Sequence, residues 1–239
     1  MTAIFKREFL SYFTSPLGYV FLGVFFAFSG LFLWLNCLVV GSADMSGVFV
    51  MMFYVIVILV PILTMRTIAD DKRQRTDQLT LTSPVSLLGL VGGKFLAAYA
   101  VFMLSEIIML IYAGFLSSAV EATGNTFAWN SFWGNFTGIS LIGGVFISVG
   151  IFISSLTENQ MIAAIGSIGA NIALCVFDIL NSIIKAEAAQ KVINSLSVFT
   201  RYYEFTLGVF SLRNILFFVS LIAIFNFLTM RFIERRRWS

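Results

Sequence analysis

The stretch LGYVFLGVFFAFSGLFLWLNCLVV, residues 17–40, contains no charged side chain, and no charge occurs anywhere in residues 9–43. A bilayer core about 30 Å thick is crossed by about 20 apolar residues in a helix. Residues 17–40 are therefore long enough to cross a membrane. The run is continuous rather than alternating, which favours a helix over a strand of an outer-membrane barrel.

Similar apolar runs recur along the chain. We predict an all-α integral membrane protein with six transmembrane helices, at residues 17–40, 45–65, 95–120, 132–156, 161–180 and 215–230. The composition agrees, because 59% of the 239 residues are hydrophobic and 11% are charged, against about 45–50% and 25% in soluble domains.

The remaining composition excludes several classes of site. The net charge of +3 is too small to indicate a nucleic-acid partner, and histidine, a frequent metal ligand, is absent. Cys37 and Cys175 lie separately inside apolar runs, without the spacing of a metal or redox site. The sequence therefore predicts no metal site and no catalytic centre of these types.

The distribution of lysine and arginine predicts the orientation. Six spans place both termini on one side of the membrane. On that side lie 11 of the 15 Lys and Arg residues. Because positive charge accumulates in cytoplasmic loops, we expect both termini in the cytoplasm.

A short amphipathic segment precedes the first span. Residues 4–13 combine Lys6, Arg7 and Glu8 with aromatic and aliphatic side chains, and Ser15-Pro16 follows as a helix break. Such a segment is typical of a helix lying in the headgroup plane, with membrane lipid as its partner. A simple basic tail is the alternative.

The sizeable hydrophilic block inside the chain is residues 66–94. Its centre, DDKRQRTD at residues 70–77, lets Asp70 and Asp71 each face the residue three or four positions later. On charge pattern alone, a solvated helix face is the simpler interpretation. Ser83-Pro84 predict the start of the helix that enters the third span.

The glycines before Lys94 resemble a phosphate-binding loop only superficially. Residue 88 is Leu where that motif has Gly, and Phe95 replaces the Ser or Thr that would hold magnesium. No nucleotide site is visible, so ATP, if it drives this protein, is bound by another chain.

The loop between the fourth and fifth spans is very short. It consists of TENQ, residues 157–160, in which Thr157 and Gln160 have the spacing of a capping box. We expect this hairpin to turn at the cytoplasmic surface, where it is available to a partner.

Small residues follow one another at helical spacing in the fourth span: Gly134, Gly138, Ser140, Gly144 and Ser148. Such a face lets two helix backbones approach closely in lipid. Packing within one chain and a contact between two copies are equally compatible with it.

Several polar residues lie within the predicted spans. Ser167, Asn171 and Asp178 share one face of the fifth span, and Glu106 lies midway along the third. Carboxylates in a membrane are costly and usually face protein or water. Asp178 is near enough to the outer surface to be hydrated, whereas Glu106 predicts either an interhelical hydrogen bond or a residue lining a pathway.

The outer segment, residues 181–214, is too long for a tight turn and too apolar for a free loop. We expect helices that dip into the outer leaflet or lie on it, where they could cover the exit of a translocation route.

These segments together resemble the permease subunits of ABC-2 type transporters, in particular the small six-span branch that includes gliding-motility and nitrous-oxide-reductase-maturation permeases. The likeness spans nearly the whole chain and is carried by residues 5–9, 66–94, 154–160 and 205–238. The most specific part is DDKRQRT at 70–76, TSPVS at 82–86 and GKF at 93–95. Arg75 departs from the pattern, because this position is usually Gly.

The resemblance implies one transmembrane domain over residues 1–239, in a bacterial cytoplasmic membrane. It implies that residues 68–79 form a coupling helix that docks on a cytoplasmic ATP-binding cassette subunit. The implied contacts are Asp70, Asp71, Lys72, Arg73, Arg75 and Thr76, with Glu158 in a second contact. The resemblance also implies that residues 4–13 form a membrane-surface helix and that the outer segment forms re-entrant helices.

The implied function is that of a permease pairing with a second permease subunit, in a homodimer or a heterodimer, and with ATPase subunits that bind ATP and magnesium. This chain would then bind no cofactor. Outward transport of a hydrophobic or amphipathic substrate, such as a peptide or a lipid-like molecule, is expected. A non-transporting membrane anchor recruited by the same ATPase is the alternative. An intramembrane enzyme using Glu106 and Asp178 is disfavoured, because the two carboxylates lie at different depths.

Overall fold

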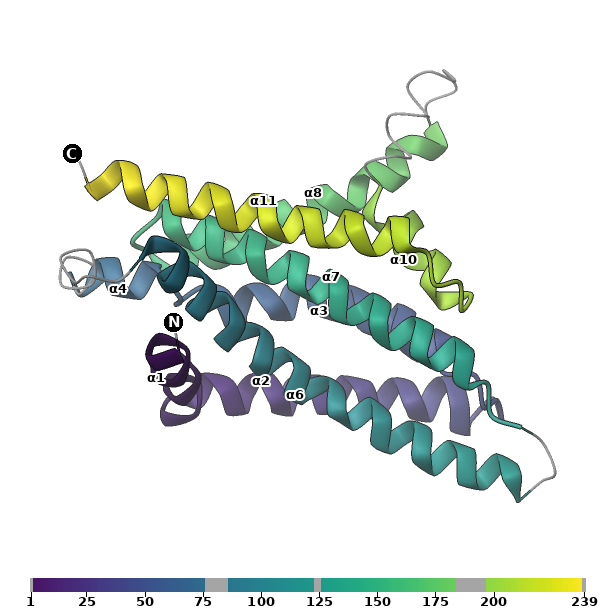
Figure 1. Cartoon of the computed structure of the whole chain (residues 1–239). Helices are drawn as coiled ribbons and strands as arrows, with labels where there is room; N and C mark the ends of the chain where they lie inside the picture. The colour runs from purple at the N-terminus through teal and green to yellow at the C-terminus, as the bar shows by residue number, and fades with distance from the viewer. Residues whose placement is uncertain (1, 76–85, 123–125, 184–196, 238–239) are drawn as a thin grey trace.

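A computed structural model describes residues 2–75, 86–122, 126–183 and 197–237, with side chains up to residue 176 in the third of these ranges and up to residue 235 in the last. Within these ranges every regular element is a helix (Figure 1). In chain order they are α1 (Thr2–Thr14), α2 (Pro16–Leu33), the π-helix η1 (Trp34–Leu38), α3 (Ser46–Thr64), α4 (Ala69–Arg73), α6 (Leu87–Glu121), α7 (Trp129–Leu156), α8 (Gln160–Ile183), α10 (Val198–Thr206) and α11 (Leu212–Arg237).

Five helical segments in the described residues are long and apolar enough to cross a membrane: Pro16–Leu38, Ser46–Arg73, Leu87–Glu121, Trp129–Leu156 and Leu212–Arg235. The apolar part of α8, Gln160–Val176, is shorter. The predicted all-α membrane fold is confirmed. Each predicted span lies largely within one of these helices, and the fifth corresponds to α8.

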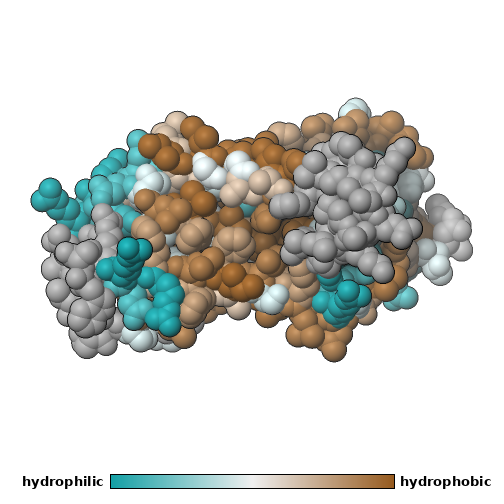
Figure 2. Space-filling view, turned by 90° about the horizontal axis from the view of Figure 1, so that it is seen from above, coloured by the Kyte–Doolittle hydropathy of each residue, from teal (hydrophilic) through white to brown (hydrophobic). Residues whose placement is uncertain are grey.

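The bundle has two distinct ends. The start of α1, α4 and the last turns of α11 lie at one end, which we call the polar end (Figure 1). Figure 2 shows a hydrophobic belt separating the hydrophilic residues at this end from the other end. Both ends of the chain therefore lie on one side of the belt, as an even number of crossings requires.

Helix α6 contains the third predicted span and begins ahead of it, as predicted. The helix begins at Leu87, and its N-cap is Ser86, whose Oγ accepts a hydrogen bond from the Gly89 amide at 3.2 Å. The predicted start at Ser83-Pro84 lies outside the described residues. The helix continues through Lys94 because carboxylates from other segments neutralise that charge.

A break separates α1 from α2. Ser15 is extended, with φ −102° and ψ 157°, and Pro16 occupies the first turn of α2. Pro at this position costs no helical hydrogen bond. As a result α1 lies across the end of α2 instead of extending it (Figure 1).

Helix α7 lies at the centre and contacts α3, α6, α8, α10 and α11. Its small residues admit neighbours from the same chain. A Cβ on Gly134 would lie 2.4 Å from the Phe205 carbonyl oxygen, and one on Gly138 would lie 2.9 Å from the Phe205 Cβ. Gly144 lies against Ile222 of α11. Intramolecular packing thus occupies this part of the small-residue face.

At the end opposite the polar end, α10 inserts into the bundle instead of lying on its surface. Val198, Tyr202 and Phe205 are buried, and the rings of Tyr202 and Phe53 stack with centroids 5.1 Å apart. Residues 184–196 of the predicted outer segment lie outside the described residues.

Candidate functional site

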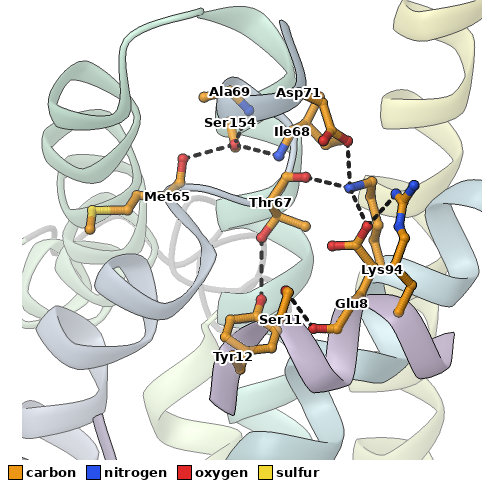
Figure 3. Close-up of polar contacts among 11 residues, drawn as sticks. Glu8, Ser11, Tyr12, Met65, Thr67, Ile68, Ala69, Asp71, Lys94 and Ser154 are labelled. Carbon is orange, nitrogen blue, oxygen red and sulfur yellow. Dashed lines mark hydrogen bonds and ion pairs between the residues drawn. The ribbon is translucent and has the colours of Figure 1, made fainter. Parts of the chain in front are cut away.

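A buried ammonium, that of Lys94 in α6, lies at the polar end and has three partners. The side chain of Lys94 is 2% exposed, and its Nζ lies 2.7 Å from Asp71 Oδ2 and 3.0 Å from Glu8 Oε1. It also donates a hydrogen bond to the Thr67 carbonyl oxygen at 2.6 Å (Figure 3). We call these four residues the Lys94 cluster.

The Lys94 cluster satisfies a strict requirement. A buried ammonium costs several kcal/mol unless its charge and its three N–H donors are matched. Here the three acceptors come from α1, from the turn between α3 and α4, and from α4 itself. The cluster therefore joins three segments that are distant in sequence to the first turns of α6.

A second anchor fixes the start of α4. Ser154 Oγ, on α7, accepts hydrogen bonds from the amides of Ile68 and Ala69 at 3.2 and 3.0 Å and donates one to the Met65 carbonyl at 3.1 Å (Figure 3). The first amides of a helix have no partner within the helix, and the N-cap residue Ile68 supplies no side-chain cap. Ser154 thus caps α4 from another helix.

The inward face of α4 contacts α8, α11 and, again, α7. Asp70 accepts a hydrogen bond from Gln160 of α8 and forms ion pairs with Arg66 and Arg73, each at 3.0 Å. Lys72 donates to the Ser155 carbonyl of α7, and its Nζ lies 5.1 Å from the ring centroid of Phe232 on α11. Asp70 and Lys72 are buried, so a fully solvated charge run is excluded for these two residues.

Helix α1 contacts the same turn through uncharged groups. The Tyr12 hydroxyl lies 3.5 Å from Thr67 Oγ1 (Figure 3). Burial raises the pKa of Tyr12 to about 12, so the side chain is neutral at physiological pH. On the same helix Arg7 pairs with Glu8 at 2.7 Å, and this hydrogen bond raises the pKa of Arg7.

The outward face of the polar end carries the remaining predicted contacts. The side chain of Arg73 is 62% exposed, and Arg75 and Glu158 are also exposed. Thr76 lies outside the described residues. The sequence-based set is thus divided: Asp70, Asp71 and Lys72 hold α4 in place, whereas Arg73, Arg75 and Glu158 lie on the surface.

The comparison with protein families decides the class of protein. The family model described as ABC-2 family transporter protein matches residues 8–238. The chain belongs to the ABC-2 transporter family. No curated protein matches it. Members of this family are transport subunits rather than catalytic ones, and they associate with an ABC ATPase subunit.

In this ABC-2 protein Arg75, where the resemblance leads us to expect glycine, has a glycine-like backbone. Arg75 has φ 57°, and it follows Gln74, the C-cap of α4. Helices commonly end in this left-handed conformation, which glycine adopts without the steric cost of a Cβ. The substitution therefore keeps the turn and places a strained, exposed arginine on it.

The polar residues within the spans are not brought together. Glu106 is fully buried where α6 meets α7, and one of its oxygens accepts a hydrogen bond from Ser140. Asn171 lies where α8 meets α3, with its amide 3.5 Å from the Val57 carbonyl, and Ser167 bonds to the Ala163 carbonyl of its own helix. Asp178 lies outside the described side chains. Ser148 likewise bonds within α7, to Val145.

Sequence reasoning did not select Lys94, Thr67, Ser154 or Ser155 as site residues. The available signal was the Gly-Lys-Phe motif at 93–95, which places a lysine at the edge of an apolar run. The capping box predicted for residues 157–160 is wrong. Asn159 Oδ1 accepts from the Met161 amide, and the Gln160 side chain reaches Asp70 instead of turning back.

Replacing Lys94 by Met should lower the free energy of unfolding by about 1–3 kcal/mol, because the partly buried carboxylates of Asp71 and Glu8 would lose the cation that lies between them. Unfolding of the purified protein in mixed micelles measures this change. Adding Asp71→Asn to the variant should restore part of the loss. Lys6→Met is the control: Lys6 is exposed, so a change below about 0.5 kcal/mol is expected. Equal effects of the two lysine substitutions would contradict the role of the cluster.

Replacing Arg75 by Gly should stabilise the end of α4 by about 1 kcal/mol, because glycine removes the cost of a left-handed residue. The matched change Arg73→Gly, inside α4, should have the opposite sign and similar size. Hydrogen exchange of the α4 amides measures both. Loss of protection in Arg75→Gly would show that the arginine side chain, not the backbone, holds this turn.

Proposed function

We propose that this chain is the permease subunit of an ABC transporter and that α4 receives the motion of a separate ATPase subunit. The observation that carries the proposal is the bonding of α4. This helix has only five residues, yet its side chains and amides contact α6, α7, α8 and α11, and Lys94 links it to α1.

The two faces of α4 have different chemistry, which supports this role. Asp71 and Lys72 contact partners from other helices of this chain, whereas Arg75 is exposed and Arg73, although paired with Asp70, has a side chain that is 62% exposed. Beside them, a polar cleft of about 240 Å³ between α1 and α4 is lined by charges of both signs, with Arg7 and Arg66 beside Glu8, Asp70 and Asp71. An ATPase surface with carboxylates would complement this face.

In the proposed mechanism, nucleotide binding draws the ATPase subunits together and displaces α4. Because the Lys94 cluster and Ser154 hold α4 to α1, α6 and α7, the displacement tilts these helices as one body instead of deforming a loop. Each nucleotide state must then favour one arrangement of the spans through differential contacts. ATP and magnesium would be bound by the ATPase subunits, and a second permease subunit, identical or related, would complete the pathway.

The orientation and substrate class follow from the same features. We propose that the polar end faces the cytoplasm of a bacterial cell, since it collects most of the lysine and arginine residues. The spans are apolar and rich in aromatic residues, which suits export of a hydrophobic or amphipathic molecule such as a peptide or a lipid.

The assignment of α4 is tested by reversing the charge of Arg73. The full-length chain, carrying an affinity tag, is isolated from its native cells, and ATP hydrolysis in the isolated complex is measured. Arg73→Glu should lower this activity at least tenfold, because a like charge at the ATPase surface costs several kcal/mol. Hydrolysis that stays at the wild-type level would place the ATPase elsewhere.

Arg231→Glu is the matched control. Arg231 is also 62% exposed and also pairs with a carboxylate three residues away, Glu234, on the last turns of α11. Its reversal should leave the isolated ATPase activity unchanged. A complex that hydrolyses ATP but moves no substrate across vesicle membranes would instead identify the chain as a membrane anchor.

A further inference from the structure

An apolar groove runs along α6 beside the N-terminal helix. It has a volume of about 1010 Å³ and is lined by Phe5 and Phe9 of α1, by α6 side chains between Leu96 and Leu110, and by Phe136 of α7. The α6 side chains Leu96, Leu104 and Ile107 are exposed. The groove therefore opens sideways, toward the surroundings of the bundle.

The length and depth of the groove match one leaflet of a bilayer. Leu96 and Leu110 are 14 residues apart on a continuous helix, which corresponds to about 21 Å at 1.5 Å per residue. Half of a hydrocarbon core is about 15 Å. A helix tilted in the membrane covers that depth over a longer path, and α6 runs at an angle to α2 (Figure 1).

The position of α1 restricts what fills the groove. At the polar end the groove is bounded by α1, through Thr2, Phe5 and Phe9. Helix α1 lies across the end of the bundle there (Figure 1). A transmembrane helix of a second copy, about 10 Å wide, must continue past α1 to leave the membrane. A lipid acyl chain whose headgroup lies at the level of α1 ends there and does not have to pass it.

A cation marks the headgroup position. Lys6 lies four residues after Thr2 and three before Phe9, so it shares their face of α1. It is exposed, and no ion pair to it occurs among the described residues. The neighbouring cations differ, because Arg7 pairs with Glu8 and Lys94 is buried. A lysine at the membrane surface attracts anionic lipid.

We propose that this groove is a binding site for an anionic phospholipid, with an acyl chain along α6 and the headgroup phosphate on Lys6. The site is independent of the ATPase contact on α4. It also gives α1 the function of holding a lipid, which fills the groove between α1 and α6 on the membrane side of the Lys94 cluster.

The test counts phospholipids bound to the purified full-length chain by native mass spectrometry, with phosphatidylglycerol and phosphatidylcholine of identical acyl chains as the probes. The wild-type chain should prefer phosphatidylglycerol about fivefold, the ratio equivalent to the roughly 1 kcal/mol of one surface lysine. Lys6→Gln should abolish the preference and Lys6→Glu should reverse it. Arg235→Gln, an exposed cation at the same end on α11, should retain it.

Filling the groove tests the acyl-chain part. Ala100 lines the groove, so Ala100→Trp should remove both lipids, whereas Ile111→Trp, at an exposed α6 position that is not among the lining residues, should remove neither. Unchanged lipid binding in Ala100→Trp would overturn the proposal. So would an unchanged phosphatidylglycerol preference in Lys6→Gln, or conversion of a dimer to a monomer by Ala100→Trp with lipid binding intact.

Discussion

A buried ammonium constrains the whole polar end of this protein. Lys94 is stable inside the protein only when two carboxylates and a carbonyl oxygen surround its Nζ, and those groups come from α1, α4 and the turn before α4. These contacts together hold the three segments in place around the start of α6. The direction of α1, the position of the short α4 and the continuation of α6 past the hydrophobic belt all follow from them. Removing any acceptor leaves charge or a donor without a partner, so the cluster is specific as well as stabilising.

This constraint gives α4 two faces with different tasks. Ser154 supplies the N-terminal cap that the sequence of α4 lacks. The side chain of Asp70 contacts α8, and that of Lys72 contacts α7 and α11. The surface side chains are then the ones that remain for a partner. Since α7 contacts both α4 and α10, a continuous packed path connects the polar end to the opposite end. A continuous packed path of this kind is a physical route by which movement at the polar end can reach the opposite end.

Much of the architecture could be predicted from the sequence, and the reasons for the failures are specific. Uncharged runs predict transmembrane helices because the bilayer imposes one dominant rule. The pair between Asp70 and Arg73 was also predictable, since helical spacing brings the two side chains together. The pairing of Asp71 was not, because its partner Lys94 is far away in sequence and belongs to another helix. The capping role predicted for Gln160 was wrong for the same reason. The Gln160 side chain bonds to Asp70 instead, and only the fold brings these two residues together. Arg75 is a different case, because its left-handed backbone is one that glycine adopts more easily and that an arginine in the sequence does not indicate.

In the proposed mechanism, α4 and the start of α6 move as one body. Gln74 directly follows α4, Leu88 is on the first turn of α6, and both are exposed. Spin labels at these two positions report the distance between the two helices by double electron–electron resonance. The measurement is made on the complex isolated with its ATPase, without nucleotide and with a non-hydrolysable ATP analogue. We expect the same distance distribution in both states. A shift or broadening on nucleotide binding would show that α4 separates from α6 and would contradict their joint movement.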